Sequence, residues 1–286
     1  MDYIEYVILL VLAIVANWFS ALAGGGAGLI QLPMLIFLGL PFPLALATHK
    51  VATVALGVGA TGRHLREGHL QPWLLALIVL AGVPGVVGGA LFILGIADRP
   101  AEIALGVLML ALSIYSMFKP QLGLAAASRH RNMPGMVLGA AGLLVIGIMN
   151  GALSAGSGLF VTLWLVYWFG LEYKLAVAHT LVAVGLGWNG AGALTMGSVA
   201  EVQWSWIPTL LLGSVIGGYL GANSSIKAGN RTIKRLYELV TLVVAIKLLL
   251  GGLALTEVDP GSGYSTMTAV PLADTIIMPL VLPMTS

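Results

Sequence analysis

The chain is poor in charged residues and lacks cysteine. Asp, Glu, Lys and Arg make up only 8% of its 286 residues, whereas a soluble domain carries about 25%. So few charges cannot cover the water-facing surface of a soluble protein of this length. The absence of cysteine excludes disulfides, thiol nucleophiles, thiolate zinc sites and cysteine-ligated iron–sulfur clusters.

The sequence also lacks the usual signatures of enzymes and of nucleic-acid-binding proteins. It contains no H-E-x-x-H or G-x-S-x-G motif, and no paired carboxylates lie within its apolar segments. Its 13 Lys and Arg residues are scattered and form no basic stripe with interleaved aromatic residues. We therefore expect no enzyme activity, no cofactor, no metal site and no nucleic-acid partner.

Apolar segments separated by short polar breaks run through the chain. They span residues 3–23, 29–40, 44–62, 72–95, 100–118, 134–153, 159–170, 175–196, 204–223 and 235–255. The mean hydropathy is +1.01. This pattern predicts an all-α polytopic membrane protein, in the bacterial inner membrane, with the lipid bilayer as a partner. The tryptophans lie mostly near segment ends, which is typical of an interfacial belt.

Two segments, 29–40 and 159–170, are too short to cross a bilayer as straight helices. Twelve residues of helix extend about 18 Å, whereas the hydrocarbon core is about 30 Å thick. Each segment follows a stretch rich in glycine or serine, which we name the first break (residues 24–28) and the second break (residues 154–158). Because backbone freed at membrane depth must be buried in protein or line a wet cavity, we predict a glycine-broken helical hairpin in each half and a site beside it.

The two halves of the chain resemble each other in sequence. Gly26 matches Gly156, and Gly39 matches Gly170. The offset between the halves grows by one position between these two pairs, and by one more before Leu80, which matches Leu212, as two single insertions would produce. The duplication predicts a first transmembrane repeat (1–118), a cytoplasmic linker (119–133), a second transmembrane repeat (134–255) and a tail of unassigned role (256–286).

The placement of Lys and Arg favours two halves that are inverted in the membrane. Cytoplasmic loops are enriched in these residues. Inverted halves put ten loop Lys and Arg inside and only Arg99 outside, whereas parallel halves divide them five to six. We therefore predict two inverted five-segment repeats, with Arg66 and Lys234 cytoplasmic and Asp98 and Glu201 external.

Motifs in the first half carry a family resemblance. Residues 24–28 (Gly-Gly-Gly-Ala-Gly) lead into 32–35 (Leu-Pro-Met-Leu), followed by 39–41 (Gly-Leu-Pro) and 45–48 (Ala-Leu-Ala-Thr). Over residues 5–253 the chain resembles the sulfite exporter TauE/SafE family of membrane permeases, with a weaker second copy of the motif. The resemblance implies a secondary transporter for small sulfur-containing anions such as sulfite or organosulfonates, or for other small carboxylates.

The chain departs from the family pattern beside these motifs. The second copy has serine in place of glycine at its break, and Leu163 stands where the first copy has Pro33. After Thr48 comes His49-Lys50, whereas the matching pair in the other half reads His179-Thr180. An additional imidazole and ammonium at this place point to a substrate or a coupling ion different from the family's usual one.

We predict a substrate site for a small anion at the midplane, between the repeats. The short helices begin near Gly28 and Gly158, where unpaired N–H groups and the positive end of the helix dipole attract an anion. The predicted site residues are Gly25, Gly26, Gly28, Thr48, His49, Lys50, Ser154, Gly156, Ser157, Gly158, His179 and Thr180. An acidic group at the midplane, which a cation carrier would need, is absent from the apolar segments.

Several alternatives remain open at this point. The glycines of the first break also suit close helix packing, and Lys50 has a stem long enough to reach the membrane surface. His49 and His179 also fit neutral packing residues. Amides such as Asn150 fit interhelical hydrogen bonds as well as substrate contacts. A non-transporting membrane subunit and a homodimer are left open, as are the coupling ion and the direction of transport.

Overall fold

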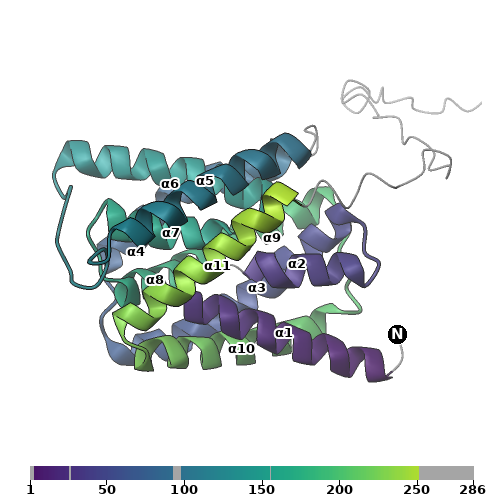
Figure 1. The fold of residues 1–286 in the computed structure, drawn as a ribbon. Coiled ribbons are helices and arrows are strands. Elements are labelled where there is room, and N and C mark those ends of the chain that lie inside the picture. The colour runs from purple at the N-terminus through teal and green to yellow at the C-terminus, as the bar shows by residue number, and fades with distance from the viewer. Residues whose placement is uncertain (1–2, 26, 93–97, 155, 251–286) are drawn as a thin grey trace, which may run out of the picture. The chain divides into compact units, whose positions relative to one another are not determined.

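Helices form nearly all of the part of the chain that the structure describes. This computed structural model describes residues 3–25, 27–92, 98–154 and 156–250 (Figure 1). The helices are α1 (Tyr3–Ala23), α2 (Ala27–Phe37), α3 (Phe42–His64), η1 (Leu65–Glu67), α4 (Pro72–Phe92), α5 (Asp98–Phe118), α6 (Met133–Leu153), α7 (Ser157–Tyr167), α8 (Tyr173–Val182), η3 (Ala183–Trp188), α9 (Asn189–Val199), α10 (Ile207–Lys227) and α11 (Asn230–Leu250). These ranges contain no strand, so the all-α fold class is confirmed. The predicted tail, 256–286, lies outside them.

The order of helix lengths is nearly the same in the two halves. In the first half α1 to α5 have 21, 11, 23, 21 and 21 residues. In the second half α6, α7, α10 and α11 have 21, 11, 21 and 21 residues. Between α7 and α10 the third segment is continuous but changes its winding, because six residues of π-helix (η3) join α8 to α9. The sequence did not predict this change.

Local sequence signals explain where several helices begin. α4 begins at Pro72, whose fixed φ suits the first turn of a helix and whose missing N–H needs no partner there. α6 is preceded by Asn132, whose side chain accepts a hydrogen bond of 3.1 Å from the N–H of Gly135. Pro134 lies in the same first turn. These signals place the helix starts close to the predicted segment boundaries.

Helices of one half pack against helices of the other. α1 contacts α10, and α6 contacts α4, which is the corresponding pair with the halves exchanged (Figure 1). Glycines at matching positions allow both contacts: a Cβ atom at Gly217 would collide with the carbonyl of Ile14, and one at Gly85 would collide with the carbonyl of Leu144. Small residues of this kind let transmembrane helices approach closely.

Four of the described helical segments are long and apolar enough to cross a membrane. They are Tyr3–Ala23, Pro43–Glu67, Pro72–Phe92 and Met133–Leu153. α7 is apolar but shorter, with 11 residues. The lengths thus agree with a protein that crosses the bilayer several times through its apolar helices.

Trp188 does not lie in the interfacial belt that the sequence suggested for the tryptophans. Its side chain is fully buried, and its Nε1 atom donates a hydrogen bond of 2.9 Å to the carbonyl of Ile78 on α4. Gly82, one turn further along α4, leaves the space that the indole fills, because a Cβ atom there would overlap the ring. Trp188 therefore anchors the third segment of the second half to α4.

Lys234 belongs to α11 and is buried, although the sequence placed it in a cytoplasmic loop. Its Nζ atom forms an ion pair of 2.6 Å with Glu238, one helical turn away. It also donates a hydrogen bond of 2.6 Å to the carbonyl of Ser116 on α5. Ser116 Oγ in turn contacts the Tyr173 hydroxyl at 3.1 Å. This cluster joins α5, α8 and α11.

Candidate functional site

The first break and the second break lie against each other in the folded chain. Gly25 has a φ of +109°, and a Cβ atom there would lie only 2.6 Å from the Cα atom of Gly158. The hydroxyl of Thr162 on α7 donates a hydrogen bond of 2.6 Å to the carbonyl of Gly24. Gly25 is therefore required both for the backbone conformation of the first break and for its close contact with α7.

Side-chain hydrogen bonds hold the second break. Ser154 has a φ of +58°, which few residues other than glycine adopt, and Gly156, with a φ of +74°, precedes α7. The amide nitrogen of Asn150 donates to Ser157 Oγ over 2.7 Å, and that hydroxyl donates to the carbonyl of Ser154 over 3.1 Å. The hydroxyl proton of Ser157 is thus already used within the break.

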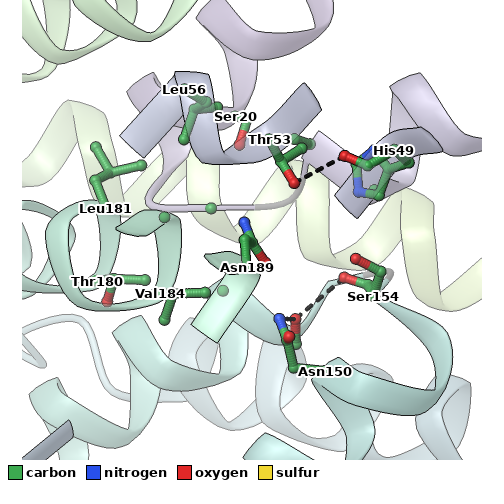
Figure 2. Close-up of a pocket in the computed structure, with 16 residues that line it drawn as sticks. Ser20, His49, Thr53, Leu56, Asn150, Ser154, Thr180, Leu181, Val184 and Asn189 are labelled. Carbon is green, nitrogen blue, oxygen red and sulfur yellow. Dashed lines mark hydrogen bonds between the residues drawn. The ribbon is translucent and has the colours of Figure 1, made fainter. Parts of the chain in front are cut away.

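A small cavity lies where the two breaks meet (Figure 2). Its volume is about 30 Å³, enough for one or two water molecules. It is lined by Ser20, Gly25, Ala27, Gly28, His49, Thr53, Leu56, Asn150, Ser154, Ser157, Gly158, Thr180, Leu181, Val184, Gly185 and Asn189. None of these lining residues is acidic, so no fixed negative charge in the wall opposes an anion.

Both halves of the chain line this cavity with residues at matching positions. The matched pairs are Ser20 with Asn150, Ala27 with Ser157, Gly28 with Gly158, His49 with Thr180, and Thr53 with Val184. The first three pairs keep the offset that relates Gly26 to Gly156 in the sequence, and the last two keep the offset that relates Gly39 to Gly170. The cavity is therefore built from corresponding parts of the two halves.

His49 lines the cavity and has one ring nitrogen without a hydrogen-bond partner in the described part of the chain. The residue lies on α3 and is 1% exposed (Figure 2). Its Nδ1 atom has no hydrogen-bond partner among the described residues. Buried polar atoms without a partner are rare, because leaving such an atom unsatisfied costs free energy. The imidazole of His49 is therefore the side chain of the lining best suited to bond a ligand.

Lys50 directs its ammonium to the end of α6 and not to the cavity. Its Nζ atom donates to the backbone oxygen of Asn150 over 2.5 Å and to the Asn150 side-chain oxygen over 2.7 Å. The residue is fully buried, so it does not reach the membrane surface. Asn150 lies in the last turn of α6, where the helix dipole is negative and attracts a cation. Lys50 thus binds Asn150, a residue of the cavity lining, without lining the cavity itself.

Thr48 and His179 occupy matching positions, and each accepts a hydrogen bond from the opposite half. Thr48 Oγ1 accepts from the backbone N–H of Gln203 over 2.9 Å. His179 Nε2 accepts from the backbone N–H of Gln71 over 2.8 Å, and its Nδ1 atom lies 2.8 Å from the carbonyl oxygen of Leu175. Both side chains are buried, and neither lines the cavity.

The structure brings together at the cavity a large part of the predicted site. The residues that line it are Gly25, Gly28, His49, Ser154, Ser157, Gly158 and Thr180. Thr48, Lys50, Gly156 and His179 lie outside the lining. Gly26 lies outside the described residues. The binding of a substrate by any of them stays a prediction.

Sequence reasoning missed some polar residues of the cavity. Ser20 and Thr53 were not named, and Asn150 and Asn189 were given two equal interpretations. Ser20 matches Asn150 at the same offset as the glycines of the two breaks, so the duplication itself held the signal that joins them. Thr53 gives no such signal, since its hydroxyl donates to the carbonyl of His49 one turn earlier, as a threonine in any helix can.

The cavity has the chemistry of a small anion site. α2 begins at Ala27 and α7 at Ser157, and both residues line the cavity. The first N–H groups of a helix have no partner within it and carry the positive end of the helix dipole. His49 adds a side-chain nitrogen. Within the described ranges no cluster of three or more His, Asp or Glu suited to a metal ion occurs.

Comparisons with known proteins show similarity over most of the chain. A family model described as "Sulfite exporter TauE/SafE" matches residues 9–248. A "Probable membrane transporter protein ORF9" of Sinorhizobium sp is 27% identical over 241 residues, which cover 84% of this chain and 91% of that protein. A "Probable membrane transporter protein" of Haemophilus influenzae is 26% identical over 242 residues, which cover 85% and 93%. No solved structure matches the chain.

Proposed function

Because the chain belongs to the sulfite exporter TauE/SafE family and is a multi-pass membrane transporter, we propose that it carries small sulfur-containing anions such as sulfite or organosulfonates. The site of transport in this proposal is the cavity at the two breaks. The observation that carries the proposal is the meeting of the starts of α2 and α7, together with the residue His49, at a cavity whose lining contains no carboxylate.

A sulfonate or sulfite group suits this lining for a geometric reason. Its oxygens are hydrogen-bond acceptors arranged around one sulfur atom, so donors must approach from several directions. The starts of two helices from different halves and the imidazole of His49 supply donors from separate elements. A carboxylate has two oxygens in one plane and would use fewer of these donors. For this reason the sulfur-containing anions come before small carboxylates in the proposal.

We place the site between two inverted repeats, each with a glycine-broken hairpin. The packing of the helices supports this arrangement. α1 contacts α10, and the corresponding helices of the opposite halves, α6 and α4, contact each other. The matched pairs of the cavity lining support it as well. Inversion would present the starts of α2 and α7 to one anion from opposite sides of the membrane midplane.

The cavity in this conformation is smaller than the proposed cargo. A volume of about 30 Å³ admits one or two water molecules, whereas sulfite alone has four non-hydrogen atoms. The walls must therefore separate before an anion enters. We propose that the structure represents a state of the transport cycle in which the site is contracted around a space too small for the anion.

The test is a screen of ligand binding on the purified protein by thermal unfolding. Sulfite, sulfoacetate, taurine and small carboxylates form the panel, and divalent cations are the counter-panel. A ligand that binds only the folded state adds about 2.7 kcal/mol of stability at one hundred times its dissociation constant. Stabilisation by divalent cations with none by any anion would show that the proposed function is wrong.

A variant pair tests the place of the site in the same assay. His49→Leu removes the imidazole of a lining residue, so it should weaken anion binding about three- to tenfold, the effect of one net hydrogen bond. His64→Leu removes another buried imidazole with an unpartnered nitrogen, which lies outside the cavity. It should leave anion binding unchanged. Equal effects of the two variants would place the anion elsewhere.

A further inference from the structure

A second cavity lies beside the N-terminus of α8. Its volume is about 350 Å³, more than ten times that of the first. Lys174, Leu175 and Ala178 of α8 line it, together with Gln71. Thr180, Leu181 and Val184, which follow along the same chain segment, line the first cavity. α8 therefore contributes residues to both cavities, and His179 lies in the sequence between the two sets of lining residues.

The hydrogen bonds of His179 define its protonation state in this conformation. The backbone N–H of Gln71 is only a donor, so His179 Nε2 must be the nitrogen that carries a lone pair. The carbonyl of Leu175 is only an acceptor, so Nδ1 must carry the proton. The imidazole is therefore neutral, and both of its nitrogens are used.

A second proton on this imidazole would go to Nε2 and would turn the acceptor into a donor. Two N–H groups would then face each other across 2.8 Å, and the bond to Gln71 would be lost. The corresponding contact of the first half behaves differently, because Thr48 Oγ1 accepts the N–H of Gln203 and does not titrate. The matched contacts thus differ in their response to protons.

Resting on the proposed transport function, we propose that His179 Nε2 is a proton-binding site, and that protonation there breaks the contact with Gln71 and opens the first cavity toward the second. The contact between Thr48 and Gln203 is then the proton-insensitive counterpart in the other half. A transporter built in this way opens one of its two sides in response to acid and the other side without it.

Other charged and titratable groups lie near His179. α3 contributes His64, η1 contributes Glu67 and the following loop contributes His69 to the second cavity, with Glu172 and Lys174 from the start of α8. Glu67 pairs with Arg63 at 2.7 Å. On α11, the ring of Tyr237 packs against Tyr173 at the beginning of α8, and Glu238 is linked to Tyr173 through Ser116. α10 ends at Lys227, the residue after Ile226 of the second cavity. Since His64 and His69 are imidazoles at the second cavity, the test must isolate the contribution of His179.

The sharpest test compares histidine with the residue that the chain itself uses at the matching position. His179→Thr keeps a hydroxyl acceptor for Gln71, as Thr48 provides for Gln203, and removes the titration. Leu181→Cys places a reporter thiol in the first cavity of a chain without native cysteine. The reporter is made alone and together with His179→Thr, and its rate of reaction with a water-soluble methanethiosulfonate is measured in detergent at pH 8 and pH 5.

At each pH, the rate for the reporter chain is divided by the rate for the reporter chain that also carries His179→Thr. The effect of pH on the thiol itself cancels in this ratio. We expect this ratio, His179 over His179→Thr, to rise about tenfold from pH 8 to pH 5, as the loss of one buried hydrogen bond would produce. An unchanged ratio overturns the proton site. His179→Gln, which also accepts without titrating, gives the same comparison if His179→Thr does not fold.

Two further measurements separate the proton site from its neighbours and from the transport proposal. His69→Gln in the reporter chain should keep the pH response, and its loss there would overturn the assignment to His179. Anion-induced stabilisation, measured on the same preparations, tests the proposed function independently. A pH response without anion binding contradicts only the transport of anions, whereas anion binding with an unchanged ratio contradicts only the proton site.

Discussion

The first break and the second break end one helix and begin another in the same way, but they use different side chains. In the first break Gly24 and Gly25 have φ values of +96° and +109°, and no side chain of that pair is available to support the turn. In the second break Ser154 and Gly156 have φ values of +58° and +74°, and hydrogen bonds through Ser157 support the turn. The positive φ values are therefore adopted by two glycines in the first break, and by a serine and a glycine supported by a local polar network in the second.

The polar network of the second break depends on the first half of the chain. Lys50 lies at the position that matches Leu181, so only the first half has an ammonium there. That ammonium reaches Asn150, and Asn150 holds Ser157. The two halves are thus not interchangeable: the first supplies a buried cation, and the second supplies the oxygens that receive it. The candidate site is therefore chemically asymmetric.

The largest effect is expected from Gly25→Ala in the first break. The new Cβ atom would lie 2.6 Å from the Cα atom of Gly158, at a φ of +109° that L-residues rarely adopt. Backbone strain and overpacking should each cost about 1–3 kcal/mol. We expect a loss of about 2–6 kcal/mol of stability and no transport, measured by thermal unfolding and by anion uptake into proteoliposomes.

Gly39→Ala is the matched control for that variant. Gly39 has a φ of +94°, but nothing lies within 4 Å of the position of a Cβ atom. This variant should lose only the conformational term, about 1–2 kcal/mol. If Gly25→Ala costs no more than Gly39→Ala, then the contact between the two breaks is not tight, and the comparison between them loses its basis.

A smaller effect is expected when the link between the halves is cut at Asn150. Asn150→Leu removes one of the two acceptors of a buried ammonium, and a hydrogen bond to a charged group contributes about 1.5–3 kcal/mol. Lys50→Met leaves only a neutral amide oxygen without its partner, so it should cost less, about 1–2 kcal/mol. The measurement is the free energy of unfolding of the two single variants.

The double variant, Asn150→Leu with Lys50→Met, shows whether the two residues act as a unit. Because neither the ammonium nor the amide oxygen is then left unpaired, its cost should fall below the sum of the single costs by about 1–2 kcal/mol. Strict additivity would mean that the two residues stabilise the protein independently. In that case the second break would not depend on the first half.

Much of the fold follows from the sequence because lipid imposes strict demands on a chain. Each helix in a bilayer must satisfy its backbone polar groups internally, so runs such as 134–153 predict α6 (Met133–Leu153) almost to the residue. The π-helical stretch, η3, was not predictable in this way. It ends at Trp188, whose indole contacts Ile78 and fills the space beside Gly82, and neither contact can be read from the periodicity of the segment.

The candidate site was partly predictable for a similar reason. Glycine and serine within apolar runs interrupt a helix, and such interruptions are tolerated at membrane depth only beside a cavity or a protein partner. The partner of Lys50 could not be foreseen, because Asn150 is far away in the sequence and adjacent residues on a helix face different sides. The contact of His179 with Gln71 joins the halves in the same way and was equally hidden.

The smallest perturbation, on the exposed surface, tests the inversion on which the comparison of the breaks relies. Arg231 and Glu201 are exposed and lie at opposite ends of α10, beyond Lys227 and before Ile207. Arg231→Cys and Glu201→Cys should each change stability by less than about 0.5 kcal/mol. In intact cells a membrane-impermeant thiol reagent should label the cysteine at 201 and not the one at 231.

Arg231 replaces Lys234 as the probe because Lys234 is buried, so a cysteine there would escape labelling from either side. Labelling of both positions from outside would contradict a membrane-spanning α10, and labelling of 231 alone would reverse the second half. With the first half in its predicted orientation, the starts of α2 and α7 would then no longer approach one anion from opposite sides, and the two breaks would not be related by inversion.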